Sequence, residues 1–216
     1  MREYNWQQFN NFGYITYKFT DEELKPLWDE VKEIQDNFSK AITYNHQLAG
    51  HLKHEYEIIK SKNHVEKLVK PFATQYNQRF DYYKSINVLT KEKAKAVSIK
   101  MDGLWVNYQR KGEFNPLHDH GGVLSFVIWL KMPYLIEDES TYFQTSIKPE
   151  QERTATFNFY YTNALGDIMN TCIPVDKTYE NTMCIFPAKM KHAVYPFYTS
   201  DEYRISVAGN FHVDPK

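Results

Sequence analysis

Residues 203–213, with the sequence YRISVAGNFHV, alternate apolar side chains with polar or small ones. In an extended chain, successive side chains point to opposite faces. One face of this stretch is apolar and carries Ile205, Val207 and Phe211. The other face carries Arg204, Ser206, Ala208 and Asn210. The pattern predicts a β-strand that is buried on its apolar side and turns its polar side toward a cavity.

Further short apolar or alternating runs precede this stretch and predict more strands. They lie at 97–99, 104–109, 123–130, 155–161 and 183–186. Turn-forming residues such as Gly112, Asn163 and Pro187 separate several of them. The chain is also rich in Tyr and Phe, with 17 and 14 copies, and both residue types favour pleated surfaces. These features predict an antiparallel β-sandwich or barrel.

The first part of the chain has a helical pattern instead. Thr20 and Glu23 form a capping-box pattern, after which apolar residues recur at helical spacing as far as Phe38. We expect a second helix at 46–59 and a third at 65–83. The prediction is one α+β domain over residues 1–216, mainly helical over about 1–96 and β-rich over about 97–216, with the helices packed on one outer face of the sheet.

Composition narrows the classes of partner and compartment. The net charge is −1, which gives no reason to expect nucleic acid or an anionic membrane as a partner. No apolar run approaches the ~20 residues of a membrane span. Cys172 and Cys184 are too few for a disulfide scaffold and suit a reducing cytoplasm, where we expect the protein. The oligomeric state cannot be predicted from these features.

Two histidines in the β-rich part, His118 and His120, are spaced as neighbours on one face of a strand. They could therefore bind one metal ion together, and a third imidazole from another strand would complete a facial set. His192 lies far downstream and is the candidate for that third ligand. Such a set leaves open positions for substrate and oxygen, as in non-haem iron enzymes.

Arg204 and Ser206 suggest an anion site on the polar face of the last strand. A guanidinium group matches a carboxylate with two hydrogen bonds, and a serine hydroxyl adds a third donor. An arginine placed in a concave β interior is costly unless an anion meets it.

The ordered set of motifs resembles the iron(II)- and 2-oxoglutarate-dependent dioxygenases, and most closely their prolyl-4-hydroxylase-like branch, common in bacterial and phage genomes. The set comprises Asn107–Gly112, Pro116-x-His118-x-His120, Phe186-Pro187 leading to His192, and Arg204-x-Ser206. The resemblance covers about residues 105–213.

This resemblance implies a double-stranded β-helix, a jelly-roll or cupin-like core, that holds Fe(II) and uses 2-oxoglutarate and O2. By the family pattern, His118 and His192 match metal ligands, and Arg204 and Ser206 match the anchor for the far carboxylate of 2-oxoglutarate. Further positions match residues that often touch the co-substrate or continue its face of the strand: Asn107, Gln109 and Asn210.

The chain departs from the family pattern at the carboxylate ligand, because it has His-x-His where His-x-Asp is usual. Strand periodicity favours His120 as the third ligand. The alternative is Asp119, turned inward by a bulge that Gly121 and Gly122 would permit.

The resemblance implies an oxygenase that hydroxylates a C–H bond of a second substrate and releases succinate and CO2. Peptidyl proline, an amino acid or another small molecule would each suit such a site. Two alternatives remain open. One is a three-histidine iron dioxygenase that does not use 2-oxoglutarate. The other is a non-catalytic β-sandwich that binds a metal for stability.

Overall fold

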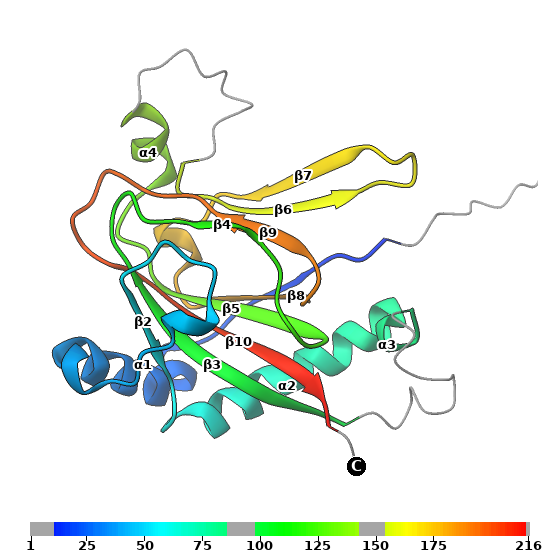
Figure 1. Ribbon diagram of the computed structural model, residues 1–216, viewed down its shortest axis with the longest axis horizontal. Helices are drawn as coiled ribbons and strands as arrows, with labels where there is room; N and C mark the ends of the chain where they lie inside the picture. Colours follow the sequence, from blue (N-terminus) through cyan, green and yellow to red (C-terminus); the bar gives the residue numbers. More distant parts are fainter. Residues whose placement is uncertain (1–10, 86–97, 143–153, 215–216) are drawn as a thin grey trace, which may run out of the picture.

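The computed structural model describes residues 11–85, 98–142 and 154–214 (Figure 1). The helices are α1 (Asp21–Asp36), α2 (Lys62–Phe80), α3 (Tyr82–Ser85) and α4 (Ile136–Tyr142), with 3-10 turns η1 (Phe38–Lys40), η2 (Asn45–Gln47) and η5 (Lys177–Tyr179). The strands are β1 (Ile15–Lys18), β2 (His54–Glu57), β3 (Ile99–Gln109), β4 (Asn115–His118), β5 (Leu124–Lys131), β6 (Phe157–Thr162), β7 (Ile168–Ile173), β8 (Thr182–Pro187), β9 (Lys191–Val194) and β10 (Arg204–Val213). Among these described helices, none combines the length and apolar character needed to cross a membrane.

The strands form two sheets that face each other (Figure 1). The larger sheet has six strands in the order β1-β8-β5-β10-β3-β2, and the smaller has four in the order β4-β9-β6-β7. Every pairing between named strands in both sheets is antiparallel. An apolar cluster that includes Trp129, Phe157 and Phe186 lies between the sheets. The predicted antiparallel sandwich is therefore confirmed.

The last strand, β10, lies inside the larger sheet between β3 and β5. Its alternation is as predicted: Ile205, Val207 and Phe211 are buried in the cluster on the helical side of the sheet. Arg204 and Ser206 pair in register with Gln109 and Asn107 of β3 on the opposite face. This face looks toward the smaller sheet, so the strand brings its polar residues into the space between the sheets.

Helices α1 and α2 cover the outer face of the larger sheet (Figure 1). The predicted capping box begins α1: Thr20 Oγ1 accepts from the Glu23 backbone N–H at 3.2 Å, and Glu23 Oε2 accepts from the Thr20 N–H at 2.8 Å. Both helices bury aliphatic side chains against the sheet, including Leu24, Leu27, Val65 and Val69. The α+β class and the placement of helices on one outer face are confirmed.

The predicted helix at 46–59 is wrong. The structure has the short turn η2 there, followed by β2, which pairs with β3 at the edge of the larger sheet. Gly50 interrupts the segment and disfavours a helix, and residues 54–57 gain more by extending the sheet than by coiling. The mainly helical N-terminal part therefore also contributes two strands, β1 and β2.

Glu30 of α1 fixes the start of α2. Its Oε1 accepts from the backbone N–H groups of Ile59 and Lys60 at 2.8 Å each, and its Oε2 accepts from Ser61 N and Ser61 Oγ at 2.7 Å each. Burial acts to raise the pKa of the Glu30 carboxyl, but these hydrogen bonds together lower it below its ordinary value. The ionised side chain thus stabilises the fold.

We expect Glu30→Ala to lower the free energy of unfolding by about 2–3 kcal/mol at neutral pH, because it leaves buried donors unpaired. Since the folded pKa is lowered, this stabilisation is present above the unfolded pKa and is lost as the pH falls through the folded value. Urea titrations at neutral pH and near about pH 3 measure both effects. Glu33→Ala is the matched control, since its ion pair with Lys60 is exposed and should contribute less than ~1 kcal/mol. Equal stability of Glu30→Ala and wild type would contradict this role.

Candidate metal centre

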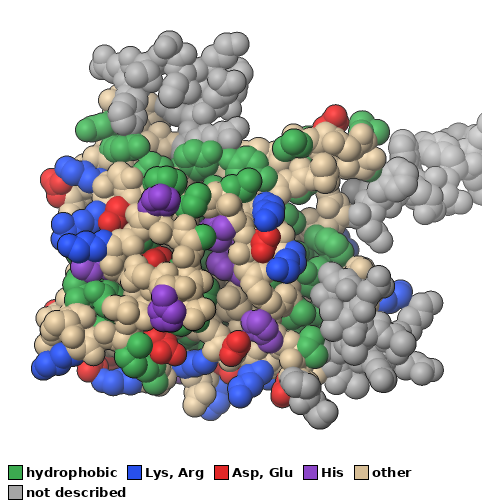
Figure 2. Space-filling view, viewed as in Figure 1, with side chains coloured by type: hydrophobic (Ala, Val, Ile, Leu, Met, Phe, Trp, Pro, Cys, Tyr) green, Lys and Arg blue, Asp and Glu red, His purple; other side chains and the backbone are tan. Residues whose placement is uncertain are grey.

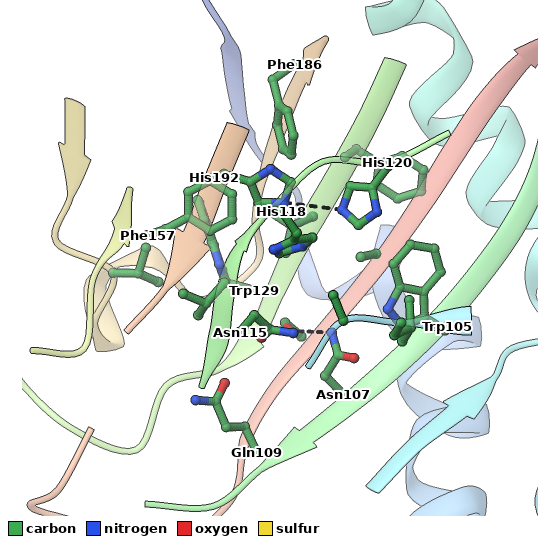
Figure 3. A pocket seen from close by; sticks show the side chains of 18 of the residues that line it. Trp105, Asn107, Gln109, Asn115, His118, His120, Trp129, Phe157, Phe186 and His192 are labelled. Carbon is green, nitrogen blue, oxygen red and sulfur yellow. Dashed lines mark hydrogen bonds between the residues drawn. The ribbon is translucent and has the colours of Figure 1, made fainter. Parts of the chain in front are cut away.

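Three histidines converge in the space between the sheets (Figure 3). His118 ends β4 and is the cross-strand partner of His192 in β9. His120 follows β4, and its backbone N–H donates to the Ala188 carbonyl at 2.8 Å. One nitrogen from each ring lies within 4.8 Å of the other two. The three imidazoles singled out in the sequence are therefore brought together.

Hydrogen bonds at the back of two rings orient them for metal binding. His118 Nδ1 lies 2.6 Å from the Pro116 carbonyl, and His192 Nδ1 lies 2.9 Å from the Met190 carbonyl. Because a carbonyl only accepts, each Nδ1 must carry the proton, which leaves each Nε2 with a free lone pair. His192 Nε2 is 3.2 Å from His120 Nε2. Two nitrogens bound at ~2.1 Å and at right angles to one ion lie ~3 Å apart, so this spacing fits a shared metal.

The cluster favours uncharged imidazoles. Burial lowers the pKa of all three histidines, and the neighbouring imidazoles lower the pKa of His120 and His192 further. The pKa of His120 falls to about 4, and that of His192 lies well below its ordinary value. Neutral imidazole is the form that binds a metal ion, so the three donors are ready near neutral pH without losing a proton.

Asp119 points away from the three rings. Its carboxylate pairs with Lys191 at 2.5 Å and with Lys189 at 3.4 Å, and the hydrogen bond from Lys191 lowers its pKa. The group of possible metal donors comprises His118, His120 and His192 without Asp119. The geometry thus favours His120 over Asp119 as the third donor.

A cavity of about 880 Å³, including its open mouth, adjoins the three histidines (Figure 3). Aromatic rings support the imidazoles: Phe157 stacks on His192 at 5.3 Å between ring centroids, and Trp105 lies 5.8 Å from His120. Figure 2 shows histidine surface near the middle of the face seen in Figure 1, beside basic and acidic side chains. His118 and His120 are only partly buried, so the site can be reached from solvent.

Arg204 is buried in the same cavity, with 4% of its surface exposed. Its Nε and Nη2 donate to Gln109 Oε1 at 3.0 and 2.6 Å, Nη1 donates to the Tyr134 hydroxyl at 2.9 Å, and Nη2 also donates to the Tyr195 carbonyl at 3.0 Å. All these acceptors are neutral, and within the described parts of the chain no carboxylate forms a salt bridge with Arg204. A buried cation of this kind favours binding of an anion.

A model of one protein family matches residues 103–210, half of the 216-residue chain. The family carries the description "Putative 2OG-Fe(II) oxygenase". This chain belongs to the 2OG-Fe(II) oxygenase family. Members use iron(II) and 2-oxoglutarate, so both are cofactors of this oxygenase, and the histidine cluster can hold the iron. No curated protein matches the sequence.

Solved structures share the fold of this oxygenase at low sequence identity. A prolyl-4-hydroxylase from Pseudomonas putida matches with a TM-score of 0.54 and 10% identity over 94% of each chain. SnoK, an α-ketoglutarate dependent carbocyclase from nogalamycin biosynthesis, matches with a TM-score of 0.53 and 10% identity over 94% of this chain and 80% of its own. The epimerase SnoN matches with a TM-score of 0.50 and 12% identity over 93% of this chain and 77% of its own. The predicted jelly-roll is confirmed, and because the fold hosts several reactions, the reaction type must come from the site.

The residues predicted to touch the co-substrate differ in their placement in the oxygenase. Asn107, Gln109 and Ser206 line the cavity with Arg204. Gln109 Oε1 accepts two hydrogen bonds from the Arg204 guanidinium group, a role that the sequence did not predict. Two N–H donors of Arg204 that were expected to be free for the co-substrate are therefore occupied. Asn210 is not among the lining residues, and its Oδ1 instead accepts from Ser125 Oγ at 2.6 Å.

Two parts of the site were missed in the sequence. Tyr134 holds Arg204 from beyond the end of β5, where no periodic pattern marks it. Residues 47–49 line the cavity from the N-terminal part, in a segment that was predicted to be helical. One general rule applies to Tyr134: the hydroxyl of a buried tyrosine needs a polar partner. Nothing in the sequence indicates which partner that is.

Proposed function

We propose that this oxygenase hydroxylates a C–H bond of a second substrate, with His118, His120 and His192 as the iron ligands and Arg204 with Ser206 as the anchor for 2-oxoglutarate. The observation that carries the proposal is that one cavity contains both the three-histidine cluster and a buried arginine whose hydrogen-bond acceptors, Gln109, Tyr134 and the Tyr195 carbonyl, are all neutral. Of the functions that the sequence left open, family membership supports this one.

The histidine cluster fits iron in its chemistry as well as in its spacing. The three neutral nitrogen donors lie on adjoining backbone segments beside the cavity, and such imidazole donors would suit iron. Iron bound here, together with 2-oxoglutarate and O2, supplies the oxidation of the C–H bond, while 2-oxoglutarate becomes succinate and CO2. The protein holds the donors, excludes water with aromatic walls and orients both substrates.

Arg204 and Ser206 supply the donors for the far carboxylate of 2-oxoglutarate. Arginine has five N–H donors, and four of them reach protein acceptors here. The fifth, on Nη1, and the Ser206 hydroxyl are two donors for one carboxylate at the cavity wall. The contacts to Gln109 and Tyr134 fix the guanidinium plane in advance, so that little side-chain entropy is lost on binding.

The second substrate would bind between the aromatic wall and the segment at 47–49. Trp105, Trp129 and Phe157 form apolar surface, and Asn115 and Gln47 add polar groups. Apolar walls with a few polar groups are typical of small-molecule sites. A small molecule, an amino acid or a prolyl side chain of a peptide fits this description. Hydroxylation is one of the reactions that this fold hosts, and the P. putida prolyl-4-hydroxylase is named for it.

Turnover of 2-oxoglutarate tests the proposal. Protein loaded anaerobically with Fe(II) and 2-oxoglutarate and then exposed to air is expected to form succinate, and more of it when a pool contains the right substrate. Mass spectrometry of peptide and metabolite pools should then show a product heavier by one oxygen atom. Protein stripped of metal should form none. Succinate formation that is independent of metal, or no succinate with any pool, would contradict the proposed function.

A further inference from the structure

Three polar side chains form a row across the larger sheet behind the anchor site. Glu55 of β2 pairs in register with Asn107 of β3, and Asn107 pairs with Ser206 of β10. Cross-strand partners place their side chains on the same face, with Cβ atoms ~4.5–5.5 Å apart. Asn107 and Ser206 line the cavity, whereas Glu55 is 1% exposed and lies one strand further from it.

Two oxygen atoms in this row lack hydrogen-bond donors. Asn107 Nδ2 donates to Ser206 Oγ at 3.3 Å, and Glu55 Oε2 accepts from Asn45 Nδ2 at 3.0 Å. Glu55 Oε1 and Asn107 Oδ1 are buried, and neither has a partner among the residues that the structure describes. Two acceptors on paired strands cannot satisfy each other. A proton on Glu55 Oε1 would make it a donor and could satisfy both atoms at once.

We propose that Glu55 is a positioning residue for 2-oxoglutarate: as a neutral carboxylic acid it donates to Asn107, Asn107 donates to Ser206, and the Ser206 hydroxyl is thereby left to donate into the cavity. This inference rests on the proposed function, since it gives a role to the serine of the anchor site. It concerns a residue that does not line the cavity itself.

The direction in which the hydrogen bonds run along this row matters, because the Ser206 hydroxyl has only one proton to donate. While Ser206 Oγ accepts from Asn107, its own O–H must point elsewhere, and the cavity is beside it. If Glu55 is ionised, it only accepts, so the Asn107 amide is drawn to donate to Glu55 and its carbonyl oxygen turns to Ser206. The Ser206 proton is then taken by Asn107, and an oxygen lone pair faces the anionic co-substrate. Ionisation of Glu55 therefore weakens binding of a carboxylate.

The surroundings of Glu55 support the neutral form. Burial, with a smaller contribution from Glu113 in the turn between β3 and β4, raises the pKa of Glu55 to about 7. The groups that face it from the 45–50 loop and from β4 are neutral amides, Asn45 and Asn115. Gly50 packs closely against this group, since a Cβ there would lie 3.0 Å from Glu55 Oε1 and 2.7 Å from Asn115 Nδ2.

The affinity of Mn(II)-loaded protein for 2-oxoglutarate, measured by calorimetry from about pH 6 to about pH 8.5, tests the proposal. We expect wild-type affinity to fall about tenfold across this range, the size of one hydrogen bond to a charged group. Glutamine has the shape of a protonated glutamate and keeps an N–H donor at every pH. The affinity of Glu55→Gln for 2-oxoglutarate should therefore stay near the value of the wild type at low pH. Glu113→Gln is the matched control. It removes a charge that raises the pKa of Glu55, so the pH at which half of the affinity change has occurred should move downward, while affinity should still fall with rising pH. His54 also lies on β2, but burial lowers its pKa, so it stays neutral over most of the range.

The outcomes are distinct. A pH trend that persists unchanged in Glu55→Gln would overturn the role of Glu55, and so would a wild-type affinity that does not vary with pH. Absence of 2-oxoglutarate binding at every pH would contradict the proposed function itself. Infrared difference spectra of wild type against Glu55→Gln give a readout without co-substrate, and they should contain the carbonyl stretch of a protonated carboxylic acid at about pH 6 but not at about pH 8.5.

Discussion

Replacing His120 with alanine is expected to weaken metal binding by at least about 100-fold, more than the 10–100-fold typical for loss of a residue that only supports a ligand. The reason is geometric, because His120 Nε2 lies 3.2 Å from His192 Nε2 and is one of three donors within 4.8 Å. With two donors left, the site loses its facial set. Calorimetric titration with Mn(II), without co-substrate, measures the change directly.

Two neighbouring variants make this test specific. Asp119→Asn should leave metal affinity within about threefold of wild type, since the Asp119 carboxylate is turned toward Lys189 and Lys191. His120→Asp should retain binding, because a carboxylate is also a good iron ligand. A large loss in Asp119→Asn combined with wild-type affinity in His120→Ala would instead assign the third ligand to Asp119. Thermal unfolding of the metal-free variants checks that the fold is intact.

The strands and helices that were predicted correctly carry their signal locally. The alternation over 203–213 and the capping box at Thr20 each need only neighbouring residues, and both are found in the structure. The missed strands lack such a signal. β1 and β7 are edge strands with mostly exposed side chains, so no apolar alternation marks either one. These strands exist because a partner strand offers hydrogen bonds, and a sequence pattern does not record the partner.

The residues of the candidate site also divide into those with a local sequence signal and those without one. The spacing of His118 and His120 and the distant His192 were enough to predict the cluster that the structure forms. The contacts of Arg204 were not predictable, because Gln109 and Tyr134 reach it from separate strands and loops. Asn210 shares the alternating face of β10, yet it lies beyond the residues that line the cavity. Periodicity therefore assigns a residue to a face, while its distance along the strand decides whether it reaches the site.

Arg204→Lys is expected to weaken 2-oxoglutarate binding by roughly 100-fold or more, in line with the ~2–5 kcal/mol cost of disrupting a buried charge pair. Lysine keeps the charge, but its ammonium is a single point with three donors on a flexible stem. It cannot satisfy Gln109 Oε1, the Tyr134 hydroxyl and the Tyr195 carbonyl while also meeting a carboxylate. Calorimetric titration of Mn(II)-loaded protein with 2-oxoglutarate measures the loss.

Metal affinity separates this effect from general damage to the cavity. Arg204 holds Gln109, Tyr134 and the Tyr195 carbonyl rather than the three imidazoles, so Arg204→Lys should bind Mn(II) within about threefold of wild type when 2-oxoglutarate is absent. Arg110→Lys is the matched control, because that guanidinium is exposed and bonds to the Tyr203 hydroxyl outside the cavity. Its affinity for 2-oxoglutarate should not change. If Arg204→Lys bound 2-oxoglutarate as tightly as wild type, the carboxylate would have to be held elsewhere, and the buried guanidinium would be a structural cation that ties β10 to β3 through Gln109.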